Sequence, residues 1–269
     1  MKIHKSNIEK ILKDCIGGQL DFKTIFIAGS KVEGFGNEKS DIDVFGIFQT
    51  TDFCNVRPQV NDDIRWDVYN DRIVCNIIHN GERYDIELLA ESGIKSLLDK
   101  YCAISVNNSI DVLSEDEVDF IHRIKHSRVI FGDEYYRNLR SMIDFDIFGV
   151  LLAKNYTEDY QNALEDIQGA LISRDYWTAY FNTQRALEYV LSAAVAIEGE
   201  TNPNPKWLFR KLDRFSQVNG DSSLVDLLLS THRSSNTEDD IENNIIKILE
   251  QCQKINVNNQ LRIKCVTEH

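Results

Sequence analysis

Short hydrophobic runs separated by polar segments dominate the first half of the chain. Their length and period are those of β-strands rather than helices. We expect strands at 24–28, 42–48, 64–69, 72–79 and 82–89. Hydrophobic positions at helical spacing predict helices at 3–16, 92–101 and 115–130. The first half is therefore predicted to be a small mixed β-sheet with flanking helices.

The pattern changes near residue 134, where hydrophobic positions begin to recur at helical spacing throughout. We expect helices at 134–143, 145–170, 174–198, 205–216, 221–232 and 237–256, followed by a loose tail at 257–269. The fold class is thus α+β. We place a sheet domain at 1–135 and an all-α helical-bundle domain at 136–269.

A β-hairpin is predicted around Asn80-Gly81, which lies between two runs of alternating residues. If these two residues form the turn, Val74 lies opposite Glu87 on the paired strands. The second strand then carries Asp85 and Glu87 on one face, because residues two apart in a strand point the same way.

A pair of carboxylates opens the strand at 42–48. Asp41 and Asp43 are two residues apart, so their side chains project from the same face, while Ile42 and Val44 enter the core. Two adjacent carboxylates repel each other, and a divalent cation removes that repulsion. Hard oxygen ligands of this kind suit Mg²⁺, which binds one or two carboxylates together with water and substrate phosphates.

A glycine-serine turn, Gly29-Ser30, follows the strand predicted at 24–28. Such a turn offers backbone N–H groups and a hydroxyl to a phosphate, and the short helix expected from Ser30 directs its N-terminus to the same place. A phosphate-binding turn beside a metal-binding strand indicates phosphoryl or nucleotidyl transfer.

The Gly29-Ser30 pair, ten further residues and then Asp41-Ile42-Asp43-Val44 resemble the signature of the DNA polymerase β-type nucleotidyltransferase superfamily. The resemblance implies that the turn, with Lys39 and Ser40 of the same loop, binds a nucleoside triphosphate. It implies that the two aspartates bind one or two Mg²⁺ ions. An Asp pair at a solvated strand end beside an ordinary loop is the structural alternative.

This superfamily has a third carboxylate on a later strand, which binds the metal or acts as a base on the incoming hydroxyl. The resemblance favours Glu87 for this role, because hydrophobic Ile86 and Leu88 flank it. Asp85, between Tyr84 and Ile86, fits nearly as well and remains the alternative. A solvated strand face is the structural explanation for either residue alone.

The helical half resembles, more loosely, the substrate domain of two-domain antibiotic nucleotidyltransferases of the aminoglycoside type. The similarity lies in an aromatic helix followed by Pro205-Lys-Trp-Leu208. It implies that Trp207 is a candidate to contact the acceptor substrate. The acids Asp159, Glu165 and Glu188 could line a pocket for a cationic acceptor, and Glu188 is the candidate retained. Core packing explains aromatic residues at helical spacing equally well. Related two-domain enzymes sometimes complete their active site with residues of a second subunit, so the resemblance also implies that a homodimer is possible.

Two histidines, His122 and His126, are four residues apart on the helix expected at 115–130, a spacing that permits zinc binding. The glutamate that follows the first histidine in zinc-binding HExxH helices is absent, and Arg123 stands in its place. Basic residues of this helix could reach a triphosphate, but solvated helix charges are the more frequent explanation.

The charge distribution argues against a long nucleic-acid substrate. The net charge is −13; residues 1–130 carry 16 basic and 22 acidic groups, and residues 131–269 carry 14 and 21. Neither half has the basic footprint of a nucleic-acid-binding protein. No hydrophobic run approaches the ~20 residues that cross a bilayer. Six cysteines without a C-x-x-C pair suit a reduced, cytoplasmic protein.

The sequence therefore predicts a Mg²⁺-dependent nucleotidyltransferase. We expect it to move an NMP, with ATP as the expected donor, to a hydroxyl of a small molecule such as an aminoglycoside-like antibiotic, releasing pyrophosphate. A protein hydroxyl, as in toxin–antitoxin pairs, or an RNA 3′ end is the alternative acceptor. A catalytically silent nucleotide-binding domain with a regulatory role is a further alternative, although all three signature acids are present.

Overall fold

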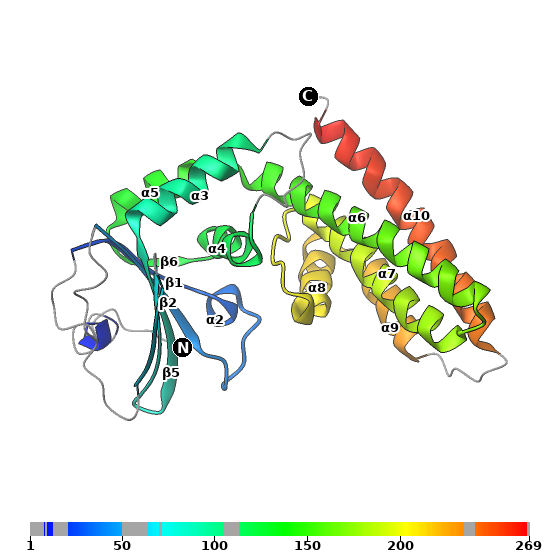
Figure 1. The fold of residues 1–269 in the computed structure, drawn as a ribbon, viewed down its shortest axis with the longest axis horizontal. Coiled ribbons are helices and arrows are strands. Elements are labelled where there is room, and N and C mark those ends of the chain that lie inside the picture. Colours follow the sequence, from blue (N-terminus) through cyan, green and yellow to red (C-terminus); the bar gives the residue numbers. More distant parts are fainter. Residues whose placement is uncertain are drawn as a thin grey trace. The chain divides into compact units, whose positions relative to one another are not determined.

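The computed structural model describes residues 8, 10–12, 21–49, 64–69, 72–104, 113–233 and 240–267. The chain divides into two compact units, one of residues 1–103 with 115–143 and one of residues 104–114 with 144–269. The division after Ile143 falls later than the domain boundary that we placed at 135/136. The architecture is α+β, with the β-sheet in the first unit and an all-helical second unit (Figure 1).

The first unit is built on a six-stranded mixed sheet with the order β3-β4-β5-β2-β1-β6. Its strands are β1 (Phe22–Ala28), β2 (Ile42–Phe48), β3 (Ile64–Val68), β4 (Arg72–His79), β5 (Glu82–Ala90) and β6 (Arg128–Phe131). β2 and β5 pair in parallel, and the other neighbours pair antiparallel. The five strands that the sequence pattern predicted are confirmed, with small differences at their ends.

The hairpin of β4 and β5 forms at the predicted residues. Asn80 and Gly81 both have positive φ, at 52° and 78°, as a two-residue hairpin turn requires. Val74 consequently pairs with Glu87, so the predicted register is confirmed.

The helices described in full beside the sheet are α2 (Ser30–Glu33), α3 (Glu91–Ala103), α4 (Glu115–Lys125) and α5 (Asp133–Ser141). The helix predicted to run to residue 130 is wrong at its end, because α4 stops at Lys125 and β6 follows. The hydroxyl of Thr24 donates to the Phe131 carbonyl at 2.8 Å, which helps hold β6 against β1. The helix expected at 3–16 lies mostly outside the described residues.

Both faces of the sheet are packed. On one face, the helical residues Ile8, Ile11 and Leu12 share a hydrophobic core with side chains of β1, β2, β4 and β5. On the other face, the rings of Phe26 and Phe45 stack with their centroids 5.2 Å apart, and both contact Phe120 of α4. By strand alternation, Asp43 and Phe45 share this second face.

The second unit consists of α6 (Phe145–Ile172), α7 (Tyr176–Ile197), a 3₁₀ turn η3 (Pro205–Trp207), α8 (Leu208–Asn219), α9 (Ser223–Arg233) and α10 (Ile241–Thr267). The side chains of Asp144 and Asp175 cap the N-termini of α6 and α7. α6 and α10 both pack along α7 (Figure 1).

The predicted loose tail at 257–269 is wrong, because α10 continues to Thr267. Two side chains explain why this end is ordered. Asn259 is buried and donates from its Nδ2 to the Val190 carbonyl of α7 at 2.9 Å, and Ile263 is also buried. Within the described residues, every helix is too short or too polar to cross a membrane.

Candidate active site

The end of β1 lies against the start of β2. Ala28 pairs with Asp43 across the two antiparallel strands, so the following residue, Gly29, is next to the Asp43 carboxylate. Gly29 has φ +79°, and a Cβ atom at this position would lie 2.5 Å from Cγ of Asp43. Both the backbone conformation and the lack of space therefore require glycine here. The turn and the carboxylate form one compact arrangement.

The loop after this turn folds back on α2. The N–H groups of Phe35 and Gly36 both donate to the carbonyl of Ser30, at 2.9 and 2.7 Å. A Cβ atom at Gly36 would lie 2.9 Å from the backbone N of Lys31, so a side chain at this position would disturb the loop. The backbone around Gly29-Ser30 is thus held by the Asp43 carboxylate on one side and by the hydrogen bonds of the following loop on the other.

A second acid lies opposite Asp43 on the neighbouring strand. The parallel register of β2 and β5 pairs Asp43 with Asp85 and Phe45 with Glu87. The negative charge of Asp85 contributes to a raised pKa of Asp43, which indicates that the two carboxylates are close. Asn76 of β4 donates to Asp85 from its Nδ2 at 2.6 Å. Asp43, Asp85 and Glu87 share one face of the sheet.

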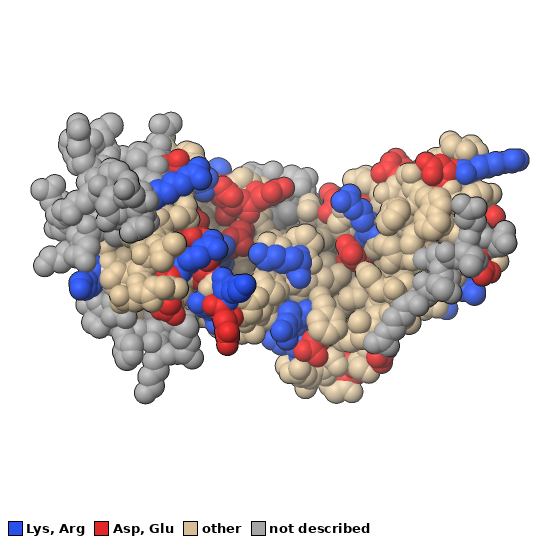
Figure 2. Space-filling view, turned by 90° about the horizontal axis from the view of Figure 1, so that it is seen from below, with Lys and Arg blue, Asp and Glu red and all other residues tan. Residues whose placement is uncertain are grey.

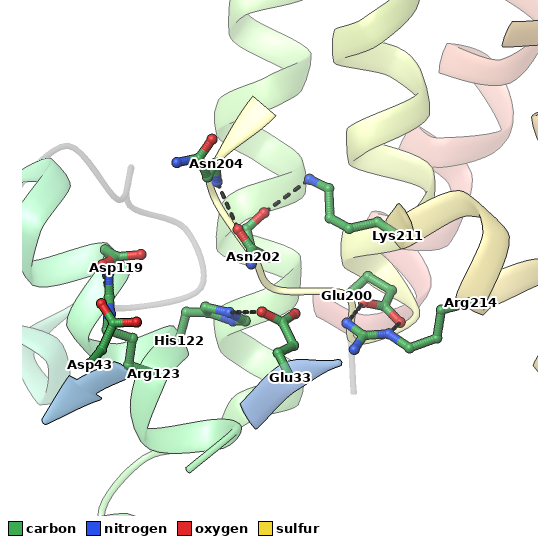
Figure 3. A network of polar contacts seen from close by, with 10 residues as sticks. All are labelled: Glu33, Asp43, Asp119, His122, Arg123, Glu200, Asn202, Asn204, Lys211 and Arg214. Atoms are coloured by element: carbon green, nitrogen blue, oxygen red, sulfur yellow. Dashed lines mark hydrogen bonds and ion pairs between the residues drawn. The ribbon is translucent and has the colours of Figure 1, made fainter. Parts of the chain in front are cut away.

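Arg123 of α4 binds the Asp43 carboxylate directly. Its Nη1 lies 2.7 Å from Oδ1 of Asp43, and its Nε contacts the carboxylate of Asp119 one helical turn earlier (Figure 3). Burial raises the pKa of Asp43, and the charge of Arg123 opposes that rise. The ionised form of Asp43 therefore depends on a cation beside it.

Asp41 is paired with a second arginine. Nη2 of Arg83 donates to Oδ2 of Asp41 at 3.2 Å, and Nε of Arg83 lies 2.9 Å from Oδ1. That Oδ1 atom is buried, and among the described residues it has this ion-pair contact with Arg83 and no hydrogen bond. An oxygen atom of this kind can accept a further donor or a cation. Arg83 precedes Asp85 by two residues, so the strand period alone could have drawn attention to it.

Glu87 shares the charge of Arg123 with Asp43 and also lies near the charge of Arg72. Burial raises its pKa, while the positive charges of Arg123 and Arg72 oppose the rise. Arg72 in turn forms an ion pair with Asp116 of α4, at 2.8 Å. Of the two candidates for the third carboxylate, Asp85 pairs with Asp43, whereas Glu87 lies among the charges of α4.

The remaining loop candidates, Lys39 and Ser40, form a local turn. The Asn37 N–H donates to Oγ of Ser40 at 2.9 Å, and the Lys39 N–H donates to Oδ1 of Asn37 at 2.9 Å. The Lys39 side chain is exposed. The structure therefore gives Ser40 a role in shaping the loop and leaves the Lys39 side chain in solvent.

The two candidates in the helical unit have separate surroundings. Trp207 ends η3, and its ring lies 5.3 Å from Nζ of Lys206. Glu188 of α7 has a pKa raised by burial, which the charges of His232 and Arg185 oppose. No contact between Trp207 and Glu188 is seen in the part of the chain that the structure describes.

Buried polar contacts also organise the segment between α7 and α8. Lys211 of α8 is fully buried and donates from its Nζ to the Asn202 carbonyl at 2.9 Å. Arg214 forms a two-pronged ion pair with Glu200, with Nε 2.6 Å from Oε1 (Figure 3). These contacts fix the segment that leads to Trp207, and the hydrophobic pattern of the sequence carried no signal of them.

The donor set of the sheet unit fits Mg²⁺. Asp41, Asp43 and Asp85 offer carboxylate oxygens from one strand and its parallel neighbour, and hard oxygen ligands are those that Mg²⁺ prefers. Asp41 also has a buried oxygen atom without a hydrogen-bond donor. Arg83 and Arg123 neutralise two of these carboxylates in the structure.

One comparison with known proteins supports the α+β fold described above. No protein-family model matches the chain, and no curated protein matches it. The crystal structure of a nucleotidyltransferase-like protein from Exiguobacterium sibiricum 255-15 matches over 96% of this chain and 76% of that chain, with a TM-score of 0.50. The chain has a nucleotidyltransferase-like fold. The two sequences are 12% identical, so the likeness concerns the fold alone.

Proposed function

We propose that the protein is a Mg²⁺-dependent nucleotidyltransferase that moves an NMP from an NTP, with ATP as the expected donor, to a hydroxyl of a small acceptor. The observation that carries the proposal is the contact of Gly29 with Asp43, together with the pairing of Asp43 and Asp85. A phosphate bound at Gly29-Ser30 would lie next to these acids. The nucleotidyltransferase-like fold is consistent with this chemistry.

The residues around the turn have distinct parts in the proposed reaction. The hydroxyl of Ser30 and the backbone amides of the turn bind oxygens of the triphosphate. Asp41 and Asp43 would hold Mg²⁺, which when bound neutralises phosphate charge and stabilises the attacking and leaving oxygens of the displacement. Lys39, whose side chain is in solvent, can reach a phosphate only by a change of its side-chain conformation.

We assign the role of the third carboxylate to Asp85 in preference to Glu87. Asp85 pairs with Asp43, so it can act on an acceptor hydroxyl at the same place as the metal-binding acids. Its hydrogen bond from Asn76 orients the carboxylate and leaves its second oxygen for a proton. Glu87 then serves to hold Arg123 and Arg72 by charge.

The acceptor is proposed to be a small polyhydroxylated molecule of the aminoglycoside type, bound by the helical unit. On the face drawn in Figure 2, the described Lys and Arg side chains are interspersed with Asp and Glu and form no continuous basic surface. The net charge of −13 also suits a cationic acceptor better than a nucleic acid. Glu188 and Trp207 remain the proposed contacts for it.

A second candidate, a nucleotide-binding regulator without catalysis, is favoured by one observation. Asp41 and Asp43 each form an ion pair with an arginine, Arg83 and Arg123 respectively. An arginine can replace a metal ion as the partner of a buried carboxylate. If Arg123 remains on Asp43 when nucleotide binds, Mg²⁺ has one ligand fewer and transfer does not proceed.

The experiment that separates these functions measures pyrophosphate release from each NTP with Mg²⁺ across a panel of aminoglycosides, lincosamides and other polyhydroxylated compounds. The wild type is compared with Asp43→Asn and with Asp67→Asn, an acid-to-amide change on the exposed edge strand β3. Release that requires one acceptor, persists in Asp67→Asn and is lost in Asp43→Asn supports transfer.

Two other results would decide against a small-molecule transferase. Nucleotide binding without pyrophosphate release for any acceptor would favour the regulator. The absence of both binding and release, in protein whose melting curve shows a folded state, would contradict both proposed functions. Protein and RNA acceptors are then tested in the same assay.

A further inference from the structure

The geometry points to a second metal site in the sheet unit, formed by Glu33, His122 and His126, that binds Zn²⁺ or a chemically similar transition-metal ion. Glu33 is the last residue of α2, His122 lies in the last turn of α4, and His126 follows that helix directly. One ligand atom from each residue lies within 4.8 Å of the other two.

The spacing of the first two ligands is already that of a zinc site. Nε2 of His122 lies 3.2 Å from Oε2 of Glu33 (Figure 3). Two ligand atoms at about 2.1 Å from a tetrahedral zinc ion are about 3.4 Å apart. The distance between these two atoms therefore suits the binding of one ion, once the imidazole turns its Nε2 lone pair from Glu33 toward the metal.

His126 is the natural third ligand. It lies four residues after His122, so the two imidazoles project from the same side of the chain. Their ring centroids are 5.2 Å apart with planes inclined by 48°, and a nitrogen of each ring lies within 4.8 Å of the other and of a Glu33 oxygen. A hydrogen bond between His122 and Glu33 would explain that one contact, but it would not explain the nearness of His126 to both.

Burial and ligand chemistry favour a metal of the zinc type. The side chains of His122 and Glu33 are only 4% and 2% exposed. A carboxylate so far from water is costly unless a cation accompanies it, and a protonated His122 or a metal ion can supply that charge. Two imidazole nitrogens with one carboxylate oxygen suit Zn²⁺, whereas Mg²⁺ prefers oxygen ligands alone. Three protein ligands also leave one coordination position open to water or another group.

A bound ion would join two parts of the sheet unit that the active site depends on. Glu33 belongs to the short helix that begins directly after Gly29, and His122 precedes Arg123, the partner of Asp43. The ion would therefore fix α2 to α4. It shares no ligand with the carboxylates of the candidate Mg²⁺ site, so its presence does not depend on the proposed reaction.

The test uses the full-length protein after treatment with a chelator. Zn²⁺ titration is expected to show one tight site per chain, and Co²⁺ in its place is expected to give the intense visible absorption of a four-coordinate site. Zn²⁺ should also raise the melting temperature. His126→Ala and Glu33→Gln are each expected to weaken Zn²⁺ binding about tenfold or more.

A control variant shows whether the effect is specific to the proposed ligands. His79→Ala removes an imidazole at the β4–β5 hairpin and should bind Zn²⁺ like the wild type. The melting temperatures of the metal-free variants show whether each variant folds. If His126→Ala does not fold, the isosteric variant Glu33→Gln is used to test the site. The proposal would be overturned if the wild type did not bind Zn²⁺ at micromolar concentration. It would also be overturned if His126→Ala and Glu33→Gln both bound Zn²⁺ as tightly as the wild type.

Discussion

Gly29 and Asp43 are in direct contact, and a Cβ atom at position 29 would lie 2.5 Å from Cγ of Asp43. The turn that is proposed to bind phosphate and the carboxylate that is proposed to bind Mg²⁺ are therefore parts of one structure. A change at either residue should affect the other.

Gly29→Ala is expected to lower both stability and pyrophosphate release. The alanine must adopt φ near +79° and displace the Asp43 carboxylate, at a combined cost of about 2–4 kcal/mol. The control is Gly34→Ala in the same loop, where φ is +86° but nothing lies within 4 Å of the new Cβ. It should cost only about 1 kcal/mol. Equal melting temperatures for the two variants would show that the contact with Asp43 is unimportant.

The third carboxylate can be identified by two isosteric variants. Asp85→Asn is expected to lower acceptor-dependent pyrophosphate release by about 100-fold or more, because it removes the acid that pairs with Asp43. Glu87→Gln is expected to lower it by only about tenfold, the low end for a group that acts through a neighbour, because Glu87 is proposed to act through Arg123. Steady-state rates at saturating NTP measure both. If Glu87→Gln lowered the rate more than Asp85→Asn did, Glu87 would be the third carboxylate.

Glu87 should also make stability depend on pH. Its pKa in the folded protein is raised above the ordinary value of 4.5, mainly by burial, so the folded state binds this proton more tightly than the unfolded state. The stability that this group contributes is complete below pH 4.5 and is lost as the pH rises through the folded pKa. Glu87→Gln should therefore be more stable than the wild type at neutral pH, and nearly equal to it below pH 4.5.

Urea unfolding of both proteins over this pH range measures the difference. Glu158→Gln, at an exposed position of α6, provides the matched control and should follow the wild type at every pH. A Glu87→Gln protein that is less stable than the wild type at neutral pH would mean that the positive charges of Arg123 and Arg72 outweigh the burial of Glu87.

The close approach of α6 and α7 can be tested at two glycines of the same helix. A Cβ atom at Gly149 would overlap the carbonyl oxygen of Ala196 and lie 3.4 Å from its carbon, whereas nothing lies within 4 Å at Gly169. Gly149→Ala is expected to cost about 1–3 kcal/mol by forcing the helices apart. Gly169→Ala should stabilise by about 0.5–1 kcal/mol, because alanine is the better helix former. Thermal or urea unfolding gives both values.

Much of the fold followed from local patterns. The hairpin residues Asn80-Gly81 fix their own register, because positive φ at both positions permits only a two-residue turn, and Val74 lies opposite Glu87 as predicted. The long helices α6 and α7 were recognisable because their hydrophobic period is sustained over many turns. Their capping aspartates, Asp144 and Asp175, strengthen the signal.

The local sequence pattern did not predict two elements of the structure. Arg128–Phe131 is too short for its period to distinguish strand from helix, and it becomes β6 because β1 offers it an edge to pair with. The last turns of α10 are held by contacts such as that of Asn259 with Val190, far apart in the chain. Tertiary pairing decided both cases.

The sequence by itself determined which residues are candidates for the chemistry: the Gly29-Ser30 turn, the Asp41 and Asp43 pair, and the two acids of the later strand. Residue type, spacing and the period of two along a strand are local properties, so they can be read without a fold. Only the tertiary structure decided which of these residues meet. The parallel register of β2 and β5 pairs Asp43 with Asp85, and α4 brings Arg123 to Asp43 and His122 to Glu33, because strand register and helix packing are set by contacts between distant parts of the chain.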